Sequence, residues 1–223
     1  MSCVISLTNK SESVASLCSA DPDLATAINK IGELTYAPYV DSFHFLVDTI
    51  VGQMLSNKVA DVISSRLALK CDGHISVDML SKLSLMDFQS IGISKNKAKS
   101  IIGLADFIRQ KPEYFGVLQY MSDGDVVKSL TSLYGIGTWT AKMYLIFVLN
   151  RQDVLPFEDG AFLQAYRWLY RTSNLSPAAI IERCNCWHPY ASIASRYLYR
   201  ILDMGYTKYP SVYDLDKEPV FQR

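Results

Sequence analysis

The sequence has few of the residues that build disulfide frameworks, metal centres or membrane spans. Among 223 residues there are five cysteines, at positions 3, 18, 71, 184 and 186, an odd number that suits reduced thiols better than paired ones. No four of them cluster, which argues against an iron–sulfur site. Cys184, Cys186 and His188 lie close together, but a fourth ligand and the usual spacing are missing, so we expect no metal site made by side chains. No uncharged apolar run approaches the roughly 20 residues that a membrane span requires.

The chain also lacks a secretory start, a linker and a net charge. The first residues, MSCVISLTNKSESV, have neither the basic start nor the continuous apolar core of a signal peptide, so we expect a cytoplasmic protein. No long polar or Gly/Ser-rich segment divides the sequence, which fits one large domain or two subdomains that share a cleft. The 22 basic and 22 acidic side chains cancel, so any binding of nucleic acid has to come from local geometry.

Apolar residues recur every three or four positions, whereas alternating apolar and polar runs are rare, so the sequence predicts an all-α protein. In SKNKAKSIIGLADFIRQK, residues 94–111, Ser94 can cap a helix whose apolar stripe lies opposite lysines. Ser122 with Asp125 resembles a capping box, and Pro177 and Pro189 fit the first turn of a helix. Further helices are expected at about residues 22–33, 42–54, 57–70, 77–82, 86–90, 122–133, 138–149, 160–171, 176–185 and 189–206.

The stretch SLYGIGTWTAKMYLIF, residues 132–147, places Gly135 and Gly137 between two expected helices. A helix, a tight turn and a second helix from Thr138 make a helix-hairpin-helix, in which glycine adopts backbone angles that other residues resist. The turn amides and the free N–H groups of the second helix can approach an anion closely, and a DNA phosphate is the obvious candidate. A tight turn with no ligand explains the same residues, so both interpretations stay open here.

Asp159, in the segment DVLPFEDGAF, begins another expected helix. A carboxylate in this place can take part in chemistry, or it can simply cap the helix and interact with the helix dipole. The local sequence does not separate the two.

Four segments in order resemble the helix-hairpin-helix DNA glycosylases, specifically the 3-methyladenine DNA glycosylase II family. LYGIGTWTA followed by DVLPFED carries the resemblance at the hairpin and the aspartate. DSFHFLVDTIVGQMLS resembles the family helix that ends in a G-Q-x-x-S turn, IGISKNKAKSIIGLADFI its G-[IL]-S-x-x-K-A segment, and WHPYASIASRYLY its closing W-x-P helix. The resemblance spans about residues 22–206 and is to a short form, since only a short polar segment precedes residue 22 where longer relatives have an N-terminal β-rich domain.

The resemblance implies two helical subdomains with an active-site cleft between them. Residues 41–149 would form one helical bundle, with the helix-hairpin-helix at about residues 122–149. Residues 1–40 and 150–223 would form the other, so that the cleft holds Asp159 opposite the hairpin.

The family's site residues carry over to matching positions. Asp159 would stabilise the positive charge that develops on the sugar as the base departs, and Trp139 would stack on the extruded base. Packing in the core is the alternative for Trp139 and for the wedge, and a solvated helix face is the alternative for Lys95, Lys97 and Lys99 as backbone contacts. The remaining roles are a DNA wedge at Gln53, Met54 and Leu55; phosphate binding at Gly135, Ile136, Gly137, Thr138 and Thr140; and a structural Na⁺ or K⁺ on backbone carbonyls near Leu133 and Gly135, with no other cofactor.

The expected function is that of a monofunctional DNA glycosylase of base excision repair, which flips out and hydrolytically excises alkylated purines such as 3-methyladenine and 7-methylguanine. Bifunctional relatives carry a lysine where this chain has Trp139, and Lys142 is the alternative source of an amine. The expected partner is double-stranded DNA with damaged bases, bound by a monomer in the cytoplasm, at the nucleoid of a bacterium or in the nucleus of a eukaryote.

Three departures from the family pattern leave the base preference open. Tyr134 stands where the family often has proline, Met54 replaces a frequent second glutamine, and Gly160 follows the aspartate where a larger residue is usual. The alternatives are a glycosylase for deaminated or oxidised bases and a noncatalytic helix-hairpin-helix DNA-binding protein.

Overall fold

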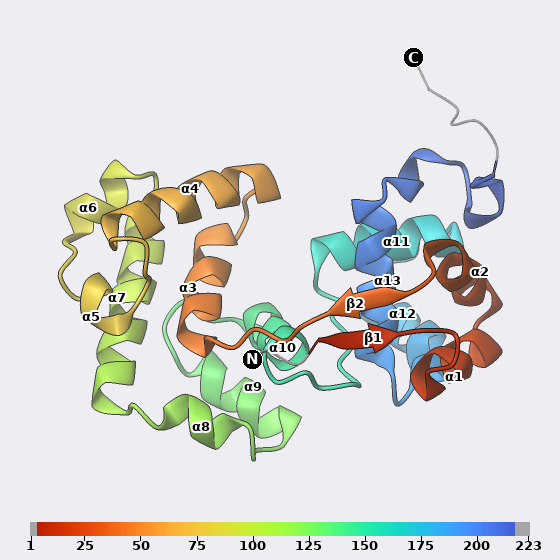
Figure 1. Ribbon diagram of the computed structural model, residues 1–223, viewed down its shortest axis with the longest axis horizontal. Helices are drawn as coiled ribbons and strands as arrows, with labels where there is room; N and C mark the ends of the chain where they lie inside the picture. The colour runs from red at the N-terminus through yellow and green to blue at the C-terminus, as the bar shows by residue number, and fades with distance from the viewer. Residues whose placement is uncertain (1–3, 217–223) are drawn as a thin grey trace. The chain divides into compact units, whose positions relative to one another are not determined.

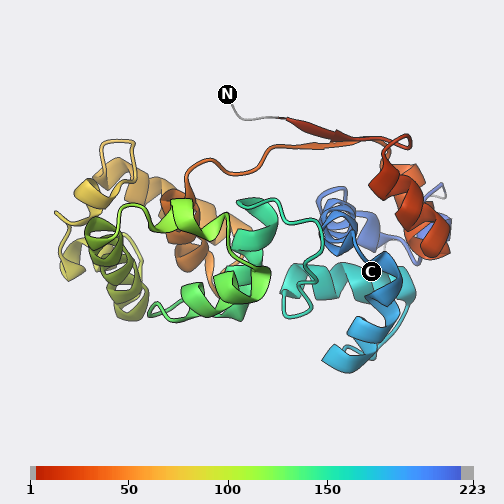
Figure 2. The same ribbon diagram turned by 90° about the horizontal axis from the view of Figure 1, so that it is seen from below.

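The computed structural model describes residues 4–216, and these are mainly helical (Figure 1). The all-α expectation is confirmed, with one small addition. Strand β1 (Ile5–Leu7) pairs antiparallel with β2 (Leu34–Tyr36), and the two lie side by side in Figure 2. Their register sets Ser6 opposite Thr35. Strands of three residues are too short to show the alternation by which a strand is predicted, which is why the sequence did not reveal them. Cys3 lies outside the described residues.

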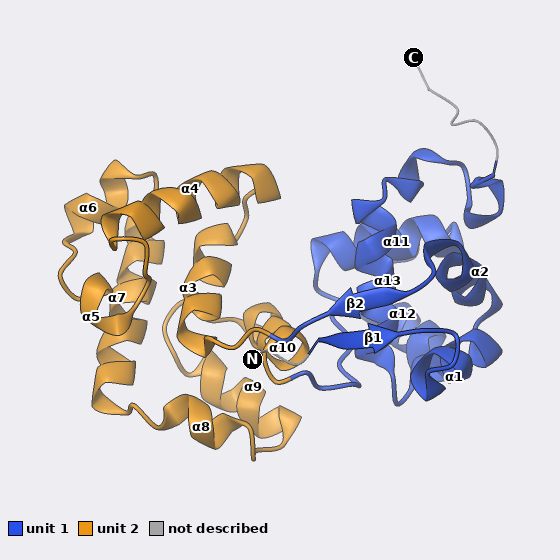
Figure 3. Cartoon of the chain, viewed as in Figure 1, with its two compact units in different colours: residues 1–38, 150–223 blue, residues 39–149 orange. Residues whose placement is uncertain are grey.

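The chain divides into two compact units, residues 1–38 with 150–223 and residues 39–149 (Figure 3). We call them the terminal unit and the central unit. Within residues 4–216, no helix combines the length and the apolarity that crossing a bilayer demands.

The terminal unit is built around α13, which packs against α1, α2 and α11. Its core includes Leu24, Phe162, Trp187 and Tyr197, all fully buried. Besides the two strands, its elements are α1 (Glu12–Ala20), α2 (Pro22–Ile31), α11 (Gly160–Tyr170), α12 (Pro177–Cys184), α13 (Ala191–Asp203) and the short 3-10 helices η1 (Asn185–Trp187), η2 (Tyr206–Lys208) and η3 (Val212–Asp214).

The central unit is organised by α3, which contacts α4, α7 and α10 (Figure 1). Helices α5 and α6 cover α7, and α9 packs against α10. Its elements are α3 (Ser42–Gly52), α4 (Asn57–Lys70), α5 (Val77–Leu80), α6 (Leu85–Ser90), α7 (Lys95–Gln110), α8 (Tyr114–Leu118), α9 (Asp123–Thr131) and α10 (Thr138–Phe147).

Local signals predicted most helix starts correctly. Ser94 and Ser122 accept hydrogen bonds from the backbone amides three residues on, and Pro177 lies in the first turn of α12. The expectation for Pro189 was wrong, because α13 begins only at Ala191. Helices α1 and α8 were not predicted, since α1 is rich in serine and α8 is a single turn interrupted by glycine.

Candidate functional site

The hairpin between α9 and α10 needs glycine at its first glycine position. Gly135 has φ +83°, in the left-handed region, and a Cβ on it would lie 2.0 Å from Oγ and 2.6 Å from Cβ of Ser100 on α7. Both the backbone angle and the contact with α7 therefore exclude a side chain. The fold alone accounts for this glycine.

Gly137 differs, because nothing in the fold requires it to be glycine. Its φ is −97°, which any residue adopts, and an added Cβ would meet no atom within 4 Å. It is the N-cap of α10 and supplies no side-chain cap. The backbone N–H groups of Gly135, Gly137 and Thr138 donate no hydrogen bond to any residue in the range 4–216. The turn therefore presents unpaired amides beside a bare backbone, an arrangement that suits an anion.

Two residues expected to bind phosphate have polar groups that form hydrogen bonds within the protein. The amide of Ile136 donates to the carbonyl of Leu133 at 3.2 Å, and its side chain is buried. Thr140 is only 1% exposed, and its hydroxyl oxygen accepts a hydrogen bond from Nε2 of Gln53 at 3.3 Å. The amide of Ile136 and the hydroxyl of Thr140 thus have partners inside the unit, whereas phosphate binding at the hairpin stays a prediction.

The turn after α3 displays an apolar side chain to solvent. Met54 is fully exposed and has φ +58°, a left-handed angle that costs free energy in a residue other than glycine. Leu55, next to it, is partly exposed. The alternative that Met54 packs in the core is therefore wrong. Gln53 points elsewhere: its Nε2 donates to the carbonyl of Gly135 at 3.0 Å, so it joins this turn to the hairpin.

The carbonyls expected near a monovalent cation each already accept one hydrogen bond. The carbonyl of Leu133 accepts from the amide of Ile136, and that of Gly135 accepts from Gln53. A carbonyl oxygen has two lone pairs, so each keeps one for a cation. Trp139 and Lys142 both lie in the first two turns of α10. Each is half-buried and interacts with other residues of the protein.

In the terminal unit, Asp159 is held firmly at the start of α11. It is the N-cap, its Oδ1 accepts the backbone amide of Phe162 at 2.7 Å, and it is only 8% exposed. The hydroxyl of Tyr199 on α13 donates to the same carboxylate. Burial raises the pKa of Tyr199 well above its usual value, and the charge and hydrogen bond of Asp159 add to this shift, so the tyrosine stays a neutral donor.

The capping interpretation of Asp159 is therefore correct but incomplete. A helix amide and a tyrosine hydroxyl together fix the orientation of this carboxylate. Tyr199 did not stand out in the sequence, since it is one of 14 tyrosines. Two other tyrosines of these helices belong to the core: Tyr166 on α11 packs on Phe162, and Tyr197 on α13 is fully buried.

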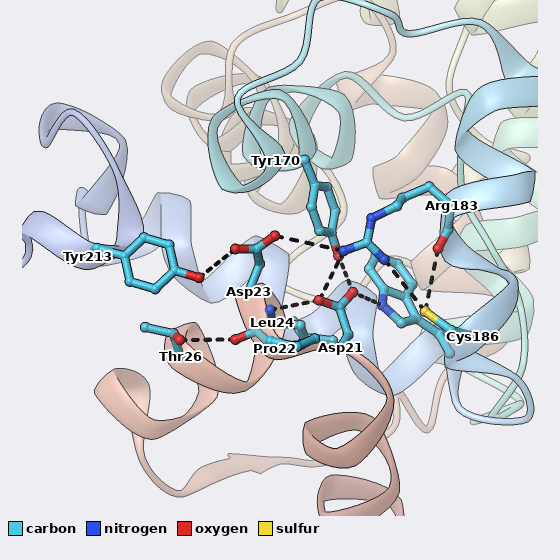
Figure 4. A network of polar contacts seen from close by, with 10 residues as sticks. Asp21, Pro22, Asp23, Leu24, Thr26, Tyr170, Arg183, Cys186 and Tyr213 are labelled. Atoms are coloured by element: carbon cyan, nitrogen blue, oxygen red, sulfur yellow. Dashed lines mark hydrogen bonds and ion pairs between the residues drawn. The ribbon is translucent and has the colours of Figure 1, made fainter.

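A second buried carboxylate, Asp21, was not predicted at all (Figure 4). Its Oδ2 accepts from the hydroxyl of Tyr170 at 2.6 Å and from Nε1 of Trp187 at 2.9 Å, while its Oδ1 accepts from the amide of Leu24 and from Arg183. Burial alone would raise the pKa of Asp21, but these hydrogen bonds and the charge of Arg183 together lower it. The cluster ties the start of α2 to α11, α12 and η1, which is a structural role.

No group of three His, Cys, Asp or Glu side chains in the described part of the chain is placed to hold a metal ion. Cys184 is buried, and Sγ of Cys186 instead lies 3.6 Å from the guanidinium of Arg183.

Comparison with known proteins places this geometry in a family context. Residues 47–189 match the HhH-GPD superfamily of base excision DNA repair proteins. The chain is 27% identical to DNA-3-methyladenine glycosylase 1 of Schizosaccharomyces pombe, over 75% of this chain and 76% of that protein. The crystal structure of DNA-3-methyladenine glycosidase from Bacillus halodurans superposes with a TM-score of 0.80 at 28% identity, covering 95% of this chain and 98% of the other. The S. pombe 3-methyladenine DNA glycosylase in complex with abasic DNA shares the fold, with a TM-score of 0.73 at 22% identity over 86% of this chain and 97% of the other.

Proposed function

Because the chain belongs to the HhH-GPD superfamily of base excision DNA repair proteins, we propose that it is a monofunctional DNA glycosylase that releases alkylated purines. The products would be a free base, of the 3-methyladenine or 7-methylguanine kind, and an abasic site. The similarity to 3-methyladenine glycosylases from a yeast and a bacterium, at 27% and 28% identity, supports the substrate class.

The observation that carries the proposal is the ordered carboxylate of Asp159. As the bond between base and sugar breaks, positive charge develops on the sugar carbon, and a fixed anion stabilises that charge without having to reorganise. The amide of Phe162 and the hydroxyl of Tyr199 hold the carboxylate in one orientation. The same carboxylate can orient the water that completes the hydrolysis.

The hairpin supplies the grip on the DNA backbone. In this proposal the unpaired amides of Gly135, Gly137 and Thr138 bind a phosphate, which explains why Gly137 is glycine although the fold does not require it. A Na⁺ or K⁺ on the carbonyls of Leu133 and Gly135 would add positive charge at that phosphate. A chain with no net charge can bind DNA in this way.

Base flipping leaves a gap in the duplex, and the turn after α3 offers a group to fill it. Met54 is apolar, flexible and fully exposed, as an intercalating wedge has to be, and Leu55 lies beside it. Trp139 would stack on the extruded base, and an alkylated purine with a positive charge gains cation–π attraction there.

Asparagine at position 159 separates the catalytic role from the capping role, because asparagine and aspartate are about equally good N-caps. We expect Asp159→Asn to fold normally but to release 3-methyladenine and 7-methylguanine from methylated DNA roughly a hundredfold more slowly or worse. The matched control is Asp41→Asn, an aspartate N-cap in the other unit, whose side chain accepts the amide of His44.

Three outcomes would contradict the proposal in different ways. Equal rates for Asp159→Asn and the wild type would show that the catalytic assignment is wrong. Release of deaminated or oxidised bases instead, from a panel of lesion-bearing duplexes, would keep the reaction and change the substrate. Binding to damaged duplexes with no release of any base would indicate a noncatalytic DNA-binding protein.

A further inference from the structure

The side chain of Lys97 points into the central unit. It lies on α7, where a lysine is an obvious candidate for a phosphate contact. Its Nζ instead donates to the backbone carbonyls of Val51 at 2.8 Å and of Gln53 at 2.6 Å. These carbonyls belong to the end of α3, where the last turn of a helix leaves carbonyls without partners and where positive charge is favourable.

The same stretch of chain is tied to the hairpin by a second set of contacts. Nε2 of Gln53 donates to the carbonyl of Gly135 and to the hydroxyl of Thr140. One turn along α7 from Lys97, the side chain of Ser100 lies directly against Gly135. Helix α7 thus contacts both segments, the end of α3 through Lys97 and the turn of the hairpin through Ser100.

Met54 follows immediately after this fixed segment. It has a strained left-handed backbone and its side chain makes no use of the core, so nothing in its own side chain stabilises the turn. The amide of Leu55 donates to the carbonyl of Gly52 at 3.0 Å and closes the turn, and within it Lys97 holds the carbonyl of Gln53 at the shorter of its two distances. Burial also lowers the pKa of Lys97, in keeping with an ammonium group directed inward.

We propose that Lys97 is a positioning residue for base flipping, which fixes the turn that carries Met54 in register with the phosphate-binding amides of the hairpin. The inference rests on the proposed function, and it assigns Lys97 a role different from a phosphate contact. Lys97 acts through Met54: without it, the wedge is present but no longer held in the conformation that enters the duplex.

The first test separates positioning from charge. The probe is a duplex with an abasic analogue and 2-aminopurine opposite it, whose fluorescence reports unstacking. We expect Lys97→Met to lose most of the fluorescence increase and to excise methylated purines about tenfold more slowly in single turnovers, as for loss of a charge-assisted hydrogen bond. Lys97→Arg, which keeps the donors, should recover part of both signals.

Salt dependence of binding to undamaged duplex provides the second readout. A lysine that neutralises one phosphate contributes about 0.9 to the slope of log affinity against log salt. We expect Lys97→Met to keep the wild-type slope. The charge-matched control is Lys111→Met, at the far end of α7, where the ammonium lies over the ring of Phe107. A slope reduced by about one in Lys97→Met alone would show a phosphate contact and overturn the proposal.

A double-mutant cycle with Met54→Ala tests whether Lys97 acts through the wedge. If it does, Lys97→Met adds little to the excision defect of Met54→Ala, because the side chain it positions is already gone. If the excision defects of Lys97→Met and Met54→Ala instead multiply in the double mutant, the inference is overturned. Lys97→Gln, which keeps a donor without the charge, replaces Lys97→Met if that variant fails to fold.

These measurements distinguish failure of this inference from failure of the proposed function. Fluorescence and binding need no base release, so they report on Lys97 even if the wild type excises nothing. A wild type that excises base while Lys97→Met flips and excises like the wild type refutes only the role of Lys97.

Discussion

Replacing Gly135 by alanine is expected to destabilise the central unit by an amount that the structure allows us to work out. The left-handed backbone at φ +83° costs about 1–2 kcal/mol once a Cβ is present. The new Cβ would also lie 2.0 Å from Oγ and 2.6 Å from Cβ of Ser100. The hydroxyl can rotate away, but Cβ is fixed to the backbone of α7, so relief requires a shift of the helix or the turn, at about 1–3 kcal/mol.

The two terms together predict a loss of about 2–5 kcal/mol in the free energy of unfolding. For a chain of this size each kcal/mol lowers the melting temperature by about 2–4 °C, so the fall should be about 4–20 °C. Urea unfolding followed by circular dichroism measures the first quantity and thermal unfolding the second. Gly137→Ala is the matched control, because its Cβ would meet no atom within 4 Å, and we expect a change of no more than about 1 kcal/mol.

DNA binding should respond in the opposite order. Gly137→Ala keeps its stability but crowds the unpaired amides, and we expect binding to duplex DNA about tenfold weaker, as for one lost charge-assisted hydrogen bond. Adding Ser100→Gly to Gly135→Ala removes the clash and should restore part of the lost stability, less about 1 kcal/mol for glycine within a helix. Wild-type stability for Gly135→Ala, or no recovery with Ser100→Gly, would refute the reasoning from the contact.

Two further predictions follow from the electrostatics and one from the sequence of the hairpin. The pKa of Asp21 is lowered in the folded state, so the stability that its carboxylate contributes is complete above the unfolded pKa and is lost as the pH falls through the folded pKa. Asp21→Asn should lower the free energy of unfolding, measured with urea at pH 7, by about 2–4 kcal/mol. The same variant should weaken the dependence of that free energy on pH below about pH 4. Hydrogen bonds from the side chain and backbone of Ser84, and then from Lys70, lower the pKa of Asp87 to about 2, and NMR titration of Ser84→Ala should show it raised toward 3.8. Treatment with borohydride during turnover should trap no covalent adduct with DNA, because the hairpin carries Trp139 where a Schiff base needs lysine; a trapped adduct would point to Lys142.

Local hydrogen bonding and helical periodicity were readable from the sequence. Ser94 and Ser122 accept the amides three residues on, as the patterns around them predict, because a cap needs only its own next turn. The left-handed Gly135 and the N-cap position of Asp159 follow from the same kind of short-range signal. These features depend on neighbours within about one helical turn.

Partners distant in the sequence could not be read in this way. Gln53 was expected in the wedge and Lys97 as a phosphate contact, yet each binds backbone of another segment, 82 residues away for Gln53 and 44 and 46 for Lys97. The internal roles of Ile136 and Thr140 were likewise hidden, because a small or apolar residue beside a glycine turn looks the same whether it faces solvent or the core.

The sequence by itself determined the helical class, most helix starts, the glycine hairpin and the acidic N-cap that the proposed chemistry needs. Only the tertiary structure decided that Met54 is the side chain left exposed, that Tyr199 shares the carboxylate of Asp159, and that Asp21 is buried among four donors. The physical reason is one of range. Backbone angles, caps and apolar faces are fixed by interactions within a few residues, whereas burial and the pairing of polar groups depend on which helices pack together, and that is settled by the free energy of the whole core.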